Sequence, residues 1–363
     1  MPEIIYLIFV SGYFILSYLF LIGVKKKFER IEEGDLPSVS VILAARNEEK
    51  NILECLKSLC ELDYPDGKLE IILVNDESTD NTEVIIKNFI SDKSNFSLLK
   101  LSETNSGLIG KSRPLAEGIK NAKGEIIFIT DADCIVPKDW IKTVVPFYKK
   151  DVAMVNGFTN QNVTGAFSGI QAIDFIYLLF VAGGIANLGK PVSCIGNNIS
   201  FRKSVYKELG GFEKLDKSVT EDFLLINEIR KLKKYKVIFT LNKSSLVTTK
   251  ACESLSELTA QKKRWAVGGT KAPLHGMFVM SWAFATNLLT ILIPLFFSAV
   301  YLYLFSFKLL IDLIALIMVH KELGITKQLK YFPFFFIYQL FYVIILPFVV
   351  LFSRTVSWKG RKY

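Results

Sequence analysis

Acidic residues stand at three places beside hydrophobic or helical runs in this chain of 363 residues, and each position suits a different chemistry. Asp76 ends a run where a carboxylate could accept the imide N–H of a nucleobase. Asp131 and Asp133 follow another run, and such hard oxygen ligands suit Mg²⁺ or Mn²⁺ together with phosphate oxygens. Asp222, at the start of a helical run, could take the proton of an attacking hydroxyl as a general base.

Each of these positions also has a plainer interpretation. The residues after Asp76 could simply cap the following helix. An Asp-x-Asp pair is common in turns after strands, although its position after a fourth parallel strand favours a metal site. Considered alone, Glu221 and Asp222 fit acids that face the dipole of a helix N-terminus better than they fit a base.

A fourth group of residues combines a cation with an aromatic ring just ahead of an uncharged segment. Gln261, Arg264 and Trp265 are spaced by three and four residues, so a helix would present them on one face. Arginine offers a planar fork for phosphate, and tryptophan offers a flat wall for a sugar ring. An interfacial helix with Lys262, Lys263 and Arg264 at lipid headgroups explains the same residues, and both interpretations can hold together.

Between residues 37 and 130, short apolar runs alternate with helical segments. We expect strands at 38–44, 69–74, 96–101 and 125–130, and helices at 48–60, 80–90 and 111–121. This alternation predicts βαβ units and a mostly parallel α/β sheet. Ligands bind such sheets where strands end, so Asp76 and Asp131 should point into one crevice.

Apolar segments at both ends of the chain are long enough to cross a membrane. Residues 4–24 carry no charge and lack an Ala-x-Ala cleavage pattern, which predicts an uncleaved anchor. Later apolar runs at 277–307, 309–319 (apart from Asp312) and 332–352 predict two or three further spans. Residues 176–186 are also uncharged, but Asp174 and Lys190 shorten the run, so we expect a buried or interfacial helix there.

Composition argues against nucleic-acid binding and against a cysteine-based site. The formal net charge is +9, but much of the lysine and arginine lies beside apolar segments, where it favours anionic headgroups. The five cysteines are odd in number and form no Cys-x-x-Cys pair. A zinc site or disulfide framework is therefore not expected, and a reducing cytosol suits these thiols.

In this order and spacing, the motifs resemble the membrane-embedded branch of glycosyltransferase family 2. That branch includes cellulose, hyaluronan and poly-N-acetylglucosamine synthases and the ceramide glucosyltransferases. The likeness covers about residues 37–270 and also includes Gly110-Lys111, Ile195-Gly196-Asn197-Asn198, Arg202 and Gly210-Gly211-Phe212. It implies a Rossmann-like GT-A fold, an inverting mechanism and a nucleotide-diphosphate sugar donor, usually UDP-linked.

The resemblance also implies a role for each matching residue. Asp222 would be the catalytic base, and Asp131 and Asp133 would hold Mg²⁺ or Mn²⁺. The residues expected at the acceptor are Glu221, Gln261 and Trp265. Those expected to bind the donor are Ala45, Arg46, Glu48, Asp76, Lys111, Asp131 and Arg264.

The leading hypothesis is an inverting membrane glycosyltransferase that moves a sugar to a lipid or glycan acceptor held in the membrane. A processive polysaccharide synthase is an alternative, although secretion of a polymer generally needs a channel of several spans. A non-catalytic nucleotide-sugar-binding membrane protein is a second alternative, but it would not need the acids at Asp131, Asp133 and Asp222. A tethered nucleotidyltransferase would need a Gly-rich phosphate loop, which the first strand lacks.

These expectations define a domain organisation. It consists of an anchor (1–24), a linker (25–36), a GT-A domain (37–254), an interfacial helix (255–275), C-terminal transmembrane segments (276–353) and a basic tail (354–363). The basic residues after the anchor place residues 25–277 in the cytosol of a multi-pass protein of the cell (inner) membrane. The basic tail also favours the cytosol, which requires an even number of C-terminal crossings. Residues 309–319 should therefore lie at the interface or merge into one crossing.

Overall fold

The computed structural model describes residues 2–31, 34, 36–102, 107–216, 220–296, 298–358 and 361–362. The chain forms two compact units. The sheet unit comprises residues 27–160, 193–250 and 357–363, and the helical unit comprises residues 1–26, 161–192 and 251–356.

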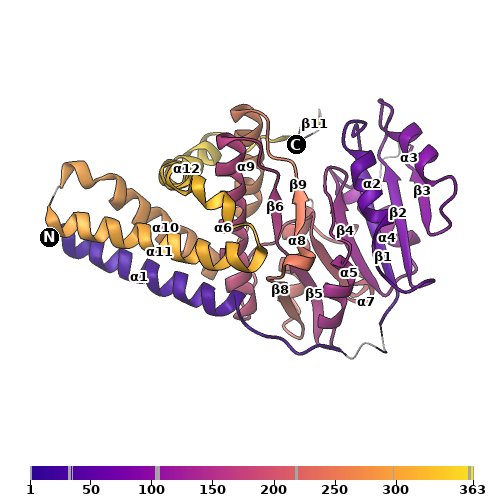
Figure 1. Cartoon of the computed structure of the whole chain (residues 1–363), viewed down its shortest axis with the longest axis horizontal. Coiled ribbons are helices and arrows are strands. Elements are labelled where there is room, and N and C mark those ends of the chain that lie inside the picture. The colour runs from indigo at the N-terminus through magenta and orange to yellow at the C-terminus, as the bar shows by residue number, and fades with distance from the viewer. Residues whose placement is uncertain are drawn as a thin grey trace. The chain divides into compact units, whose positions relative to one another are not determined.

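The sheet unit is built on seven strands in the order β3-β2-β1-β4-β7-β5-β8 (Figure 1). They are β1 (Val39–Ala45), β2 (Leu69–Asn75), β3 (Phe96–Lys100), β4 (Ile126–Asp131), β5 (Val152–Gly157), β7 (Ile199–Arg202) and β8 (Lys236–Thr240). Strands β1 to β4 pair in parallel, β7 runs antiparallel to both β4 and β5, and β5 is parallel to β8. The predicted mostly parallel α/β sheet is confirmed, with the first four strands within one residue of their expected bounds.

Helices cover both faces of this sheet, which explains why its strands read as continuous apolar runs. The helices of the sheet unit are α2 (Ile52–Cys60), α3 (Thr82–Ile90), α4 (Ser112–Asn121), α5 (Trp140–Val144), α7 (Lys203–Glu208) and α8 (Glu221–Lys231). On one face, Val41 and Leu43 pack in a buried cluster with Leu56 of α2. On the other face, α4 approaches so closely that a Cβ on Gly118 would lie 2.6 Å from the side chain of Ile42. Four short strands form two further two-stranded sheets, β6 (Thr159–Gln161) with β9 (Val247–Thr249) and β10 (Ser357–Trp358) with β11 (Arg361–Lys362).

The register of the parallel strands brings three carboxyl ends to one edge of the sheet. Ala45 at the end of β1 is opposite Asn75 at the end of β2, and Ala44 is opposite Asp131 at the end of β4. The residues that follow β1 and β2 therefore start from the same edge as Asp131, as expected for a ligand-binding crevice.

The described residues of the helical unit form six helices of 15 residues or more. They are α1 (Pro2–Val24), α6 (Ala166–Asn187), α9 (Leu255–Gly269), α10 (Leu274–Ile291), α11 (Ala299–Leu323) and α12 (Phe332–Phe352). Within the described part of the chain, five helices are long and apolar enough to cross a membrane: α1, α6, α10, α11 and the helix that ends at Phe352. By this measure the chain is a membrane protein.

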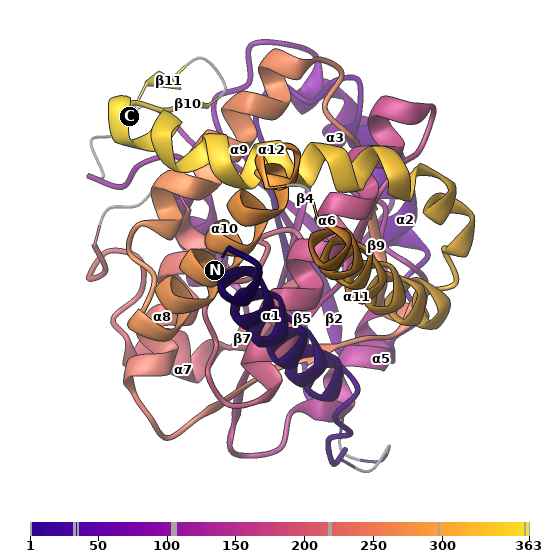
Figure 2. The same ribbon diagram turned by 90° about the vertical axis from the view of Figure 1, so that its left-hand side faces the viewer.

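Three helices of this unit run side by side, and two others run across them. Figure 1 shows α1, α10 and α11 next to one another, and α1 contacts both partners. Tyr6 of α1 stacks on Tyr301 of α11 with ring centroids 4.7 Å apart. Figure 2 looks along these three helices and shows α12 lying across them. Helix α6 also runs across α1, where a Cβ on Gly23 would lie 2.1 Å from the carbonyl oxygen of Gly184.

The C-terminal apolar region breaks at a different place from the one expected. The runs 277–307 and 309–319 were separated at Lys308, but helix α11 passes through Lys308 without interruption. Lys308 and Asp312 are both buried and pair within the helix at 2.8 Å, and the hydroxyl of Tyr13 donates to Asp312 at 2.6 Å. Because their charges are satisfied inside the unit, they do not end the helix. The break lies instead at the short 3₁₀ turn Ile293–Leu295, which contains Pro294.

Candidate active site

One lysine and three carboxylates gather at the carboxyl edge of the sheet. Lys111, at the start of α4, forms an ion pair with Asp131, the last residue of β4. Burial alone would lower the pKa of Lys111. The carboxylates of Asp131, Glu221 and Asp222 outweigh that effect and raise this pKa, so all three lie within electrostatic reach of the amine.

Glu221 and Asp222 reach this cluster from the first turn of α8, after Thr220 as its N-cap. Glu221 is 8% exposed, and burial raises the pKa of its carboxyl to about 7. Nearby Lys111 opposes this rise, and Asp222 adds to it. Glu221 therefore changes its charge near neutral pH. The next residue, Asp222, has different contacts.

The side chain of Asp222 is fixed by its own backbone and by the segment before β7. Its Oδ1 accepts a hydrogen bond from the Phe223 amide at 2.7 Å, and its carbonyl accepts one from the Cys194 thiol at 3.4 Å. A Cβ on Gly196 would lie 3.2 Å from its Oδ2. The close approach of Gly196 leaves the carboxylate little freedom on that side.

Asp133 lies two residues beyond Asp131, half-buried beside the same edge. Burial raises the pKa of Asp133 to about 6, and the negative charges of Asp131 and Glu48 add to the rise. Among the described residues, no group of three or more His, Cys, Asp and Glu side chains is placed to hold a metal ion by itself. Mg²⁺ is commonly held by one or two carboxylates together with substrate phosphate oxygens. Asp131 and Asp133 fit that arrangement, since a cation between them would relieve their repulsion.

A second polar cluster surrounds Asp76 at the end of β2, and it contains two residues that sequence reasoning did not place there. Asp76 is 1% exposed, with its carboxylate 3.9 Å from Arg46 and 3.8 Å from Arg113. Both arginines also pair with Glu77, at 3.4 and 2.9 Å. Arg113 and Glu77 carried only a weak signal in the sequence, namely their positions close to Lys111 and Asp76.

The loops after β1 and β2 are tied to each other and to the start of α3. Asn47 and Glu77 both adopt positive φ, at 54° and 56°, an uncommon conformation for residues other than glycine. The Glu48 amide donates to Thr82 at 2.8 Å, and the Asn47 side chain accepts from the Thr79 amide at 2.8 Å. The alternative that this segment caps α3 describes Asp80, which accepts from the Thr82 amide at 3.0 Å, and it does not describe Asp76.

Two residues beside this cluster have local partners within the loops. The amide side chain of Asn75 donates to Glu83 at 2.9 Å and accepts from the Ser78 amide at 3.2 Å. Ala45 is buried, and its carbonyl accepts the Asp76 amide at 2.9 Å. Ala45 thus positions Asp76 through the backbone.

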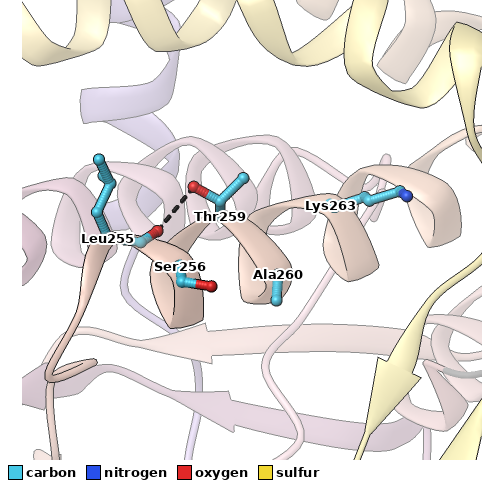
Figure 3. A pocket seen from close by; sticks show the side chains of 5 residues that line it. All are labelled: Leu255, Ser256, Thr259, Ala260 and Lys263. Atoms are coloured by element: carbon cyan, nitrogen blue, oxygen red, sulfur yellow. Dashed lines mark hydrogen bonds between the residues drawn. The ribbon is translucent and has the colours of Figure 1, made fainter.

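Gln261, Arg264 and Trp265 lie on α9 in the helical unit, where Trp265 packs at 5.5 Å from the ring of Phe175. The expectation that Lys262 reaches lipid headgroups is wrong, because Lys262 is 3% exposed and ion-paired with Asp174 of α6. The other side of α9 carries a shallow pocket, shown in Figure 3 and lined by Leu255, Ser256, Thr259, Ala260 and Lys263. Lys263 therefore lies on the exposed side of the helix and Lys262 on the buried side.

Comparison with known families assigns the chain to glycosyl transferases. The profile of glycosyl transferase family 2 matches residues 40–210, and that of glycosyl transferase family group 2 matches residues 126–352. A β-monoglucosyldiacylglycerol synthase of Nostoc sp. is 29% identical over 256 residues, which cover 67% of this chain and 51% of the relative. A poly-β-1,6-N-acetyl-D-glucosamine synthase of Staphylococcus epidermidis is 29% identical over 290 residues, which cover 74% of this chain and 65% of that protein. The chain thus spans about half the length of the first of these relatives.

A solved structure matches nearly the whole chain. It is that of the mannosyltransferase PcManGT from Pyrobaculum calidifontis in complex with GDP-Man and Mn²⁺, with a TM-score of 0.61 and 19% sequence identity. The match covers 92% of this chain and 98% of that protein. The likeness confirms the predicted GT-A fold.

Proposed function

Because the chain belongs to glycosyl transferase family group 2, we propose that it moves a sugar from a nucleotide-diphosphate donor to an acceptor held in the membrane, with inversion at the anomeric carbon. The observation that carries this proposal is the cluster of Lys111, Asp131, Glu221 and Asp222 at one edge of the sheet. It combines a cation for the diphosphate with a carboxylate that can accept a proton.

The donor would extend along this edge from Asp76 to Lys111. The buried Asp76 carboxylate would accept the imide N–H of uracil, with Arg46 and Arg113 holding the carboxylate in place. The Lys111 amine would contact the diphosphate, and its ion pair with Asp131 would be weakened as a result. UDP is therefore our preferred donor nucleotide.

Asp131 and Asp133 are the residues that would hold Mg²⁺ or Mn²⁺, and a bound ion would neutralise charge on the departing diphosphate. The chain's own contribution to bond making is Asp222. Its carboxylate would take the proton from the acceptor hydroxyl as the oxygen attacks the anomeric carbon. A leaving group neutralised in this way needs no general acid, so one base is sufficient.

The acceptor side would involve Glu221, next to the base, and the α9 residues Gln261, Arg264 and Trp265. Arg264 would contact the diphosphate, and Trp265 would offer a flat surface to the sugar or the acceptor. The two relatives named above make a glycolipid and a polysaccharide. We prefer transfer of a sugar to a membrane lipid, with polymer synthesis as the second candidate.

Replacement of Asp222 by asparagine tests the assignment of the base. The variant keeps the size of the side chain, so donor affinity should stay nearly unchanged while turnover falls by about 100- to 10,000-fold. Arg264→Ala provides the contrast, because it should also weaken donor binding. Turnover by Asp222→Asn equal to that of the wild type would reject this base.

A panel experiment identifies the substrates. Membranes that contain the full chain are incubated with labelled UDP-glucose, UDP-N-acetylglucosamine and GDP-mannose, and lipid-soluble products are then separated from polymer. Label in a lipid product supports the preferred acceptor class, and label in polymer supports the synthase. Donor binding without any transfer would favour the non-catalytic nucleotide-sugar-binding protein.

A further inference from the structure

A buried charge lies within the motif that carries Gln261, Arg264 and Trp265. Lys262 is 3% exposed and Asp174 is 1% exposed, and the two side chains form an ion pair between α9 and α6. The side chain of the neighbouring Lys263 is half-buried, and its amine donates to the Ser353 hydroxyl at 2.8 Å. Of these two consecutive lysines, only Lys262 is fully buried.

The ion pair lies directly against Trp265. The Lys262 amine is 4.7 Å from the centroid of the Trp265 ring and 5.0 Å from that of Tyr342 on α12. Phe175, the residue after Asp174, packs against the indole of Trp265, with ring centroids 5.5 Å apart. The indole is therefore held from α6 by an aromatic ring and from its own helix by a cation that Asp174 fixes in place.

A second polar network links α6 to other helices of the same unit. One turn beyond Asp174, the hydroxyl of Tyr177 on α6 is 2.5 Å from that of Tyr13 on α1. Tyr13 in turn donates to Asp312 of α11, the partner of Lys308. Helix α6, which holds Lys262 of α9 through Asp174, is thus also bonded to α1, and α1 to α11.

A buried ion pair of this kind contributes little to the free energy of folding. Removing two charges from water costs free energy, and replacing a buried pair by apolar residues of similar size is often neutral or stabilising. We propose that Lys262 and Asp174 are positioning residues, which hold the Trp265 indole in the orientation that receives the acceptor. This inference rests on the proposed function of Trp265 as part of the acceptor site.

The test separates position from stability by comparing three variants of the full chain in lipid nanodiscs. Lys262→Met alone leaves the Asp174 charge buried and should lower the unfolding temperature. The double variant Lys262→Met with Asp174→Leu removes both charges and should return the unfolding temperature close to that of the wild type. Lys263→Met is the matched control, because it makes the same change one residue away on the exposed side of α9 (Figure 3).

The position of the indole is measured by acrylamide quenching of its fluorescence. The Trp265 signal is obtained as the difference between each protein and the same protein with Trp265→Phe. The double variant should show a quenching constant raised by about twofold or more, because the cation against the ring is gone. Lys263→Met should match the wild type. An unchanged constant in the double variant overturns the positioning role.

Transfer kinetics with the acceptor from the substrate panel then link position to function. The double variant should raise the acceptor KM by about tenfold and leave the donor KM unchanged. If Trp265→Phe itself leaves the acceptor KM unchanged while the quenching responds as expected, the acceptor role of Trp265 fails and the positioning role stands. A double variant with wild-type quenching and wild-type KM shows that the pair is structural only.

Discussion

At the scale of single residues, two adjacent acids occupy contrasting environments. Glu221 is buried and has a pKa of about 7, whereas Asp222 has its Oδ1 bonded to the next amide and Gly196 against its other oxygen. Enzymes commonly assign different tasks to neighbouring carboxyls through such differences. The contrast supports Asp222 as the base and Glu221 as its neighbour at the acceptor.

The raised pKa of Glu221 predicts a specific pH dependence of stability. Its carboxyl titrates near 7 in the folded chain and near 4.5 in its ordinary state. The folded state therefore binds the proton more tightly, so this contribution to stability is complete below pH 4.5 and is lost as the pH rises to about 7. A glutamine at position 221 cannot titrate, so the Glu221→Gln variant should not lose stability in this way as the pH rises. The unfolding temperature of Glu221→Gln minus that of the wild type should thus increase from pH 4.5 to 7.

The matched control is Glu54→Gln, which changes an exposed glutamate beside Lys57 on α2. The unfolding temperature of Glu54→Gln minus that of the wild type should stay constant from pH 4.5 to 7 in detergent solution. A Glu221→Gln difference that is flat between pH 4.5 and 7 would show that burial does not hold this carboxyl protonated.

Gly196 allows the position of Asp222 to be changed without removing the carboxylate. In Gly196→Ala the new Cβ would lie 3.2 Å from Oδ2, a tight contact that displaces the carboxylate slightly. Misplacement of a catalytic group by about 1 Å can cost on the order of 100-fold in rate, so a smaller shift should lower turnover by about tenfold. Donor affinity, measured by calorimetry with UDP, should remain unchanged. Loss of affinity with normal turnover would contradict this.

At the scale of elements, the sequence predicted the parallel strands because helices on both faces make them uniformly apolar. It misplaced the break in the C-terminal helices, since a charge at Lys308 reads as an end unless its partner Asp312 is known. The contacts of Lys262 and Arg113 were also not predictable, because each depends on residues distant in the chain. The positions of Asp76, Asp131 and Asp222 came from motif spacing, and their environments came only from the structure.

The crossing of α1 and α6 depends on glycines, which makes it sensitive to a single methyl group. A Cβ on Gly184 would lie 2.5 Å from the Cα of Phe20, so the two backbones would have to separate. Overpacking of this kind costs about 1–3 kcal/mol, and Gly184→Ala should lower the unfolding temperature in detergent accordingly. Gly269→Ala, on α9, has nothing within 4 Å of the new Cβ and serves as the control. Equal unfolding temperatures for both variants would show that α1 and α6 do not approach so closely.

At the scale of the whole molecule, the helices must be divided between those that cross the membrane and those that do not. Helix α6 lies in sequence between β5 and β7, which pair with each other in one sheet. A crossing by α6 would require residues 188–198 to return through the hydrocarbon as irregular backbone, which lipid does not tolerate. We therefore expect α6 not to cross, in agreement with the interpretation of its short apolar run.

From the orientation of α12 we infer which helices provide the even number of C-terminal crossings that the basic tail requires. Because α12 runs across α1, α10 and α11, these three can cross the membrane together while α12 lies along its surface (Figure 2). Two C-terminal crossings then return the chain to the side of Lys25–Lys27, where Arg354 also belongs by the positive-inside rule. Residues 309–319 had two expected positions, at the interface or merged into a crossing. They are continuous with residues 299–308 in α11, which fits the second. In this proposal α12 is the segment that does not cross.

Cysteine labelling in intact cells tests this topology. With a membrane-impermeant maleimide, Glu3→Cys should be labelled, and Arg354→Cys should be labelled only after the cells are opened, because α1, α10 and α11 make three crossings between them. The native Cys60, which is exposed on α2, provides an internal control for the cytosolic side and should likewise react only in opened cells. If Arg354→Cys reacts in intact cells while Cys60 does not, α12 crosses the membrane and the surface position proposed for it is wrong. If Cys60 itself reacts in intact cells, the orientation of the whole chain is reversed.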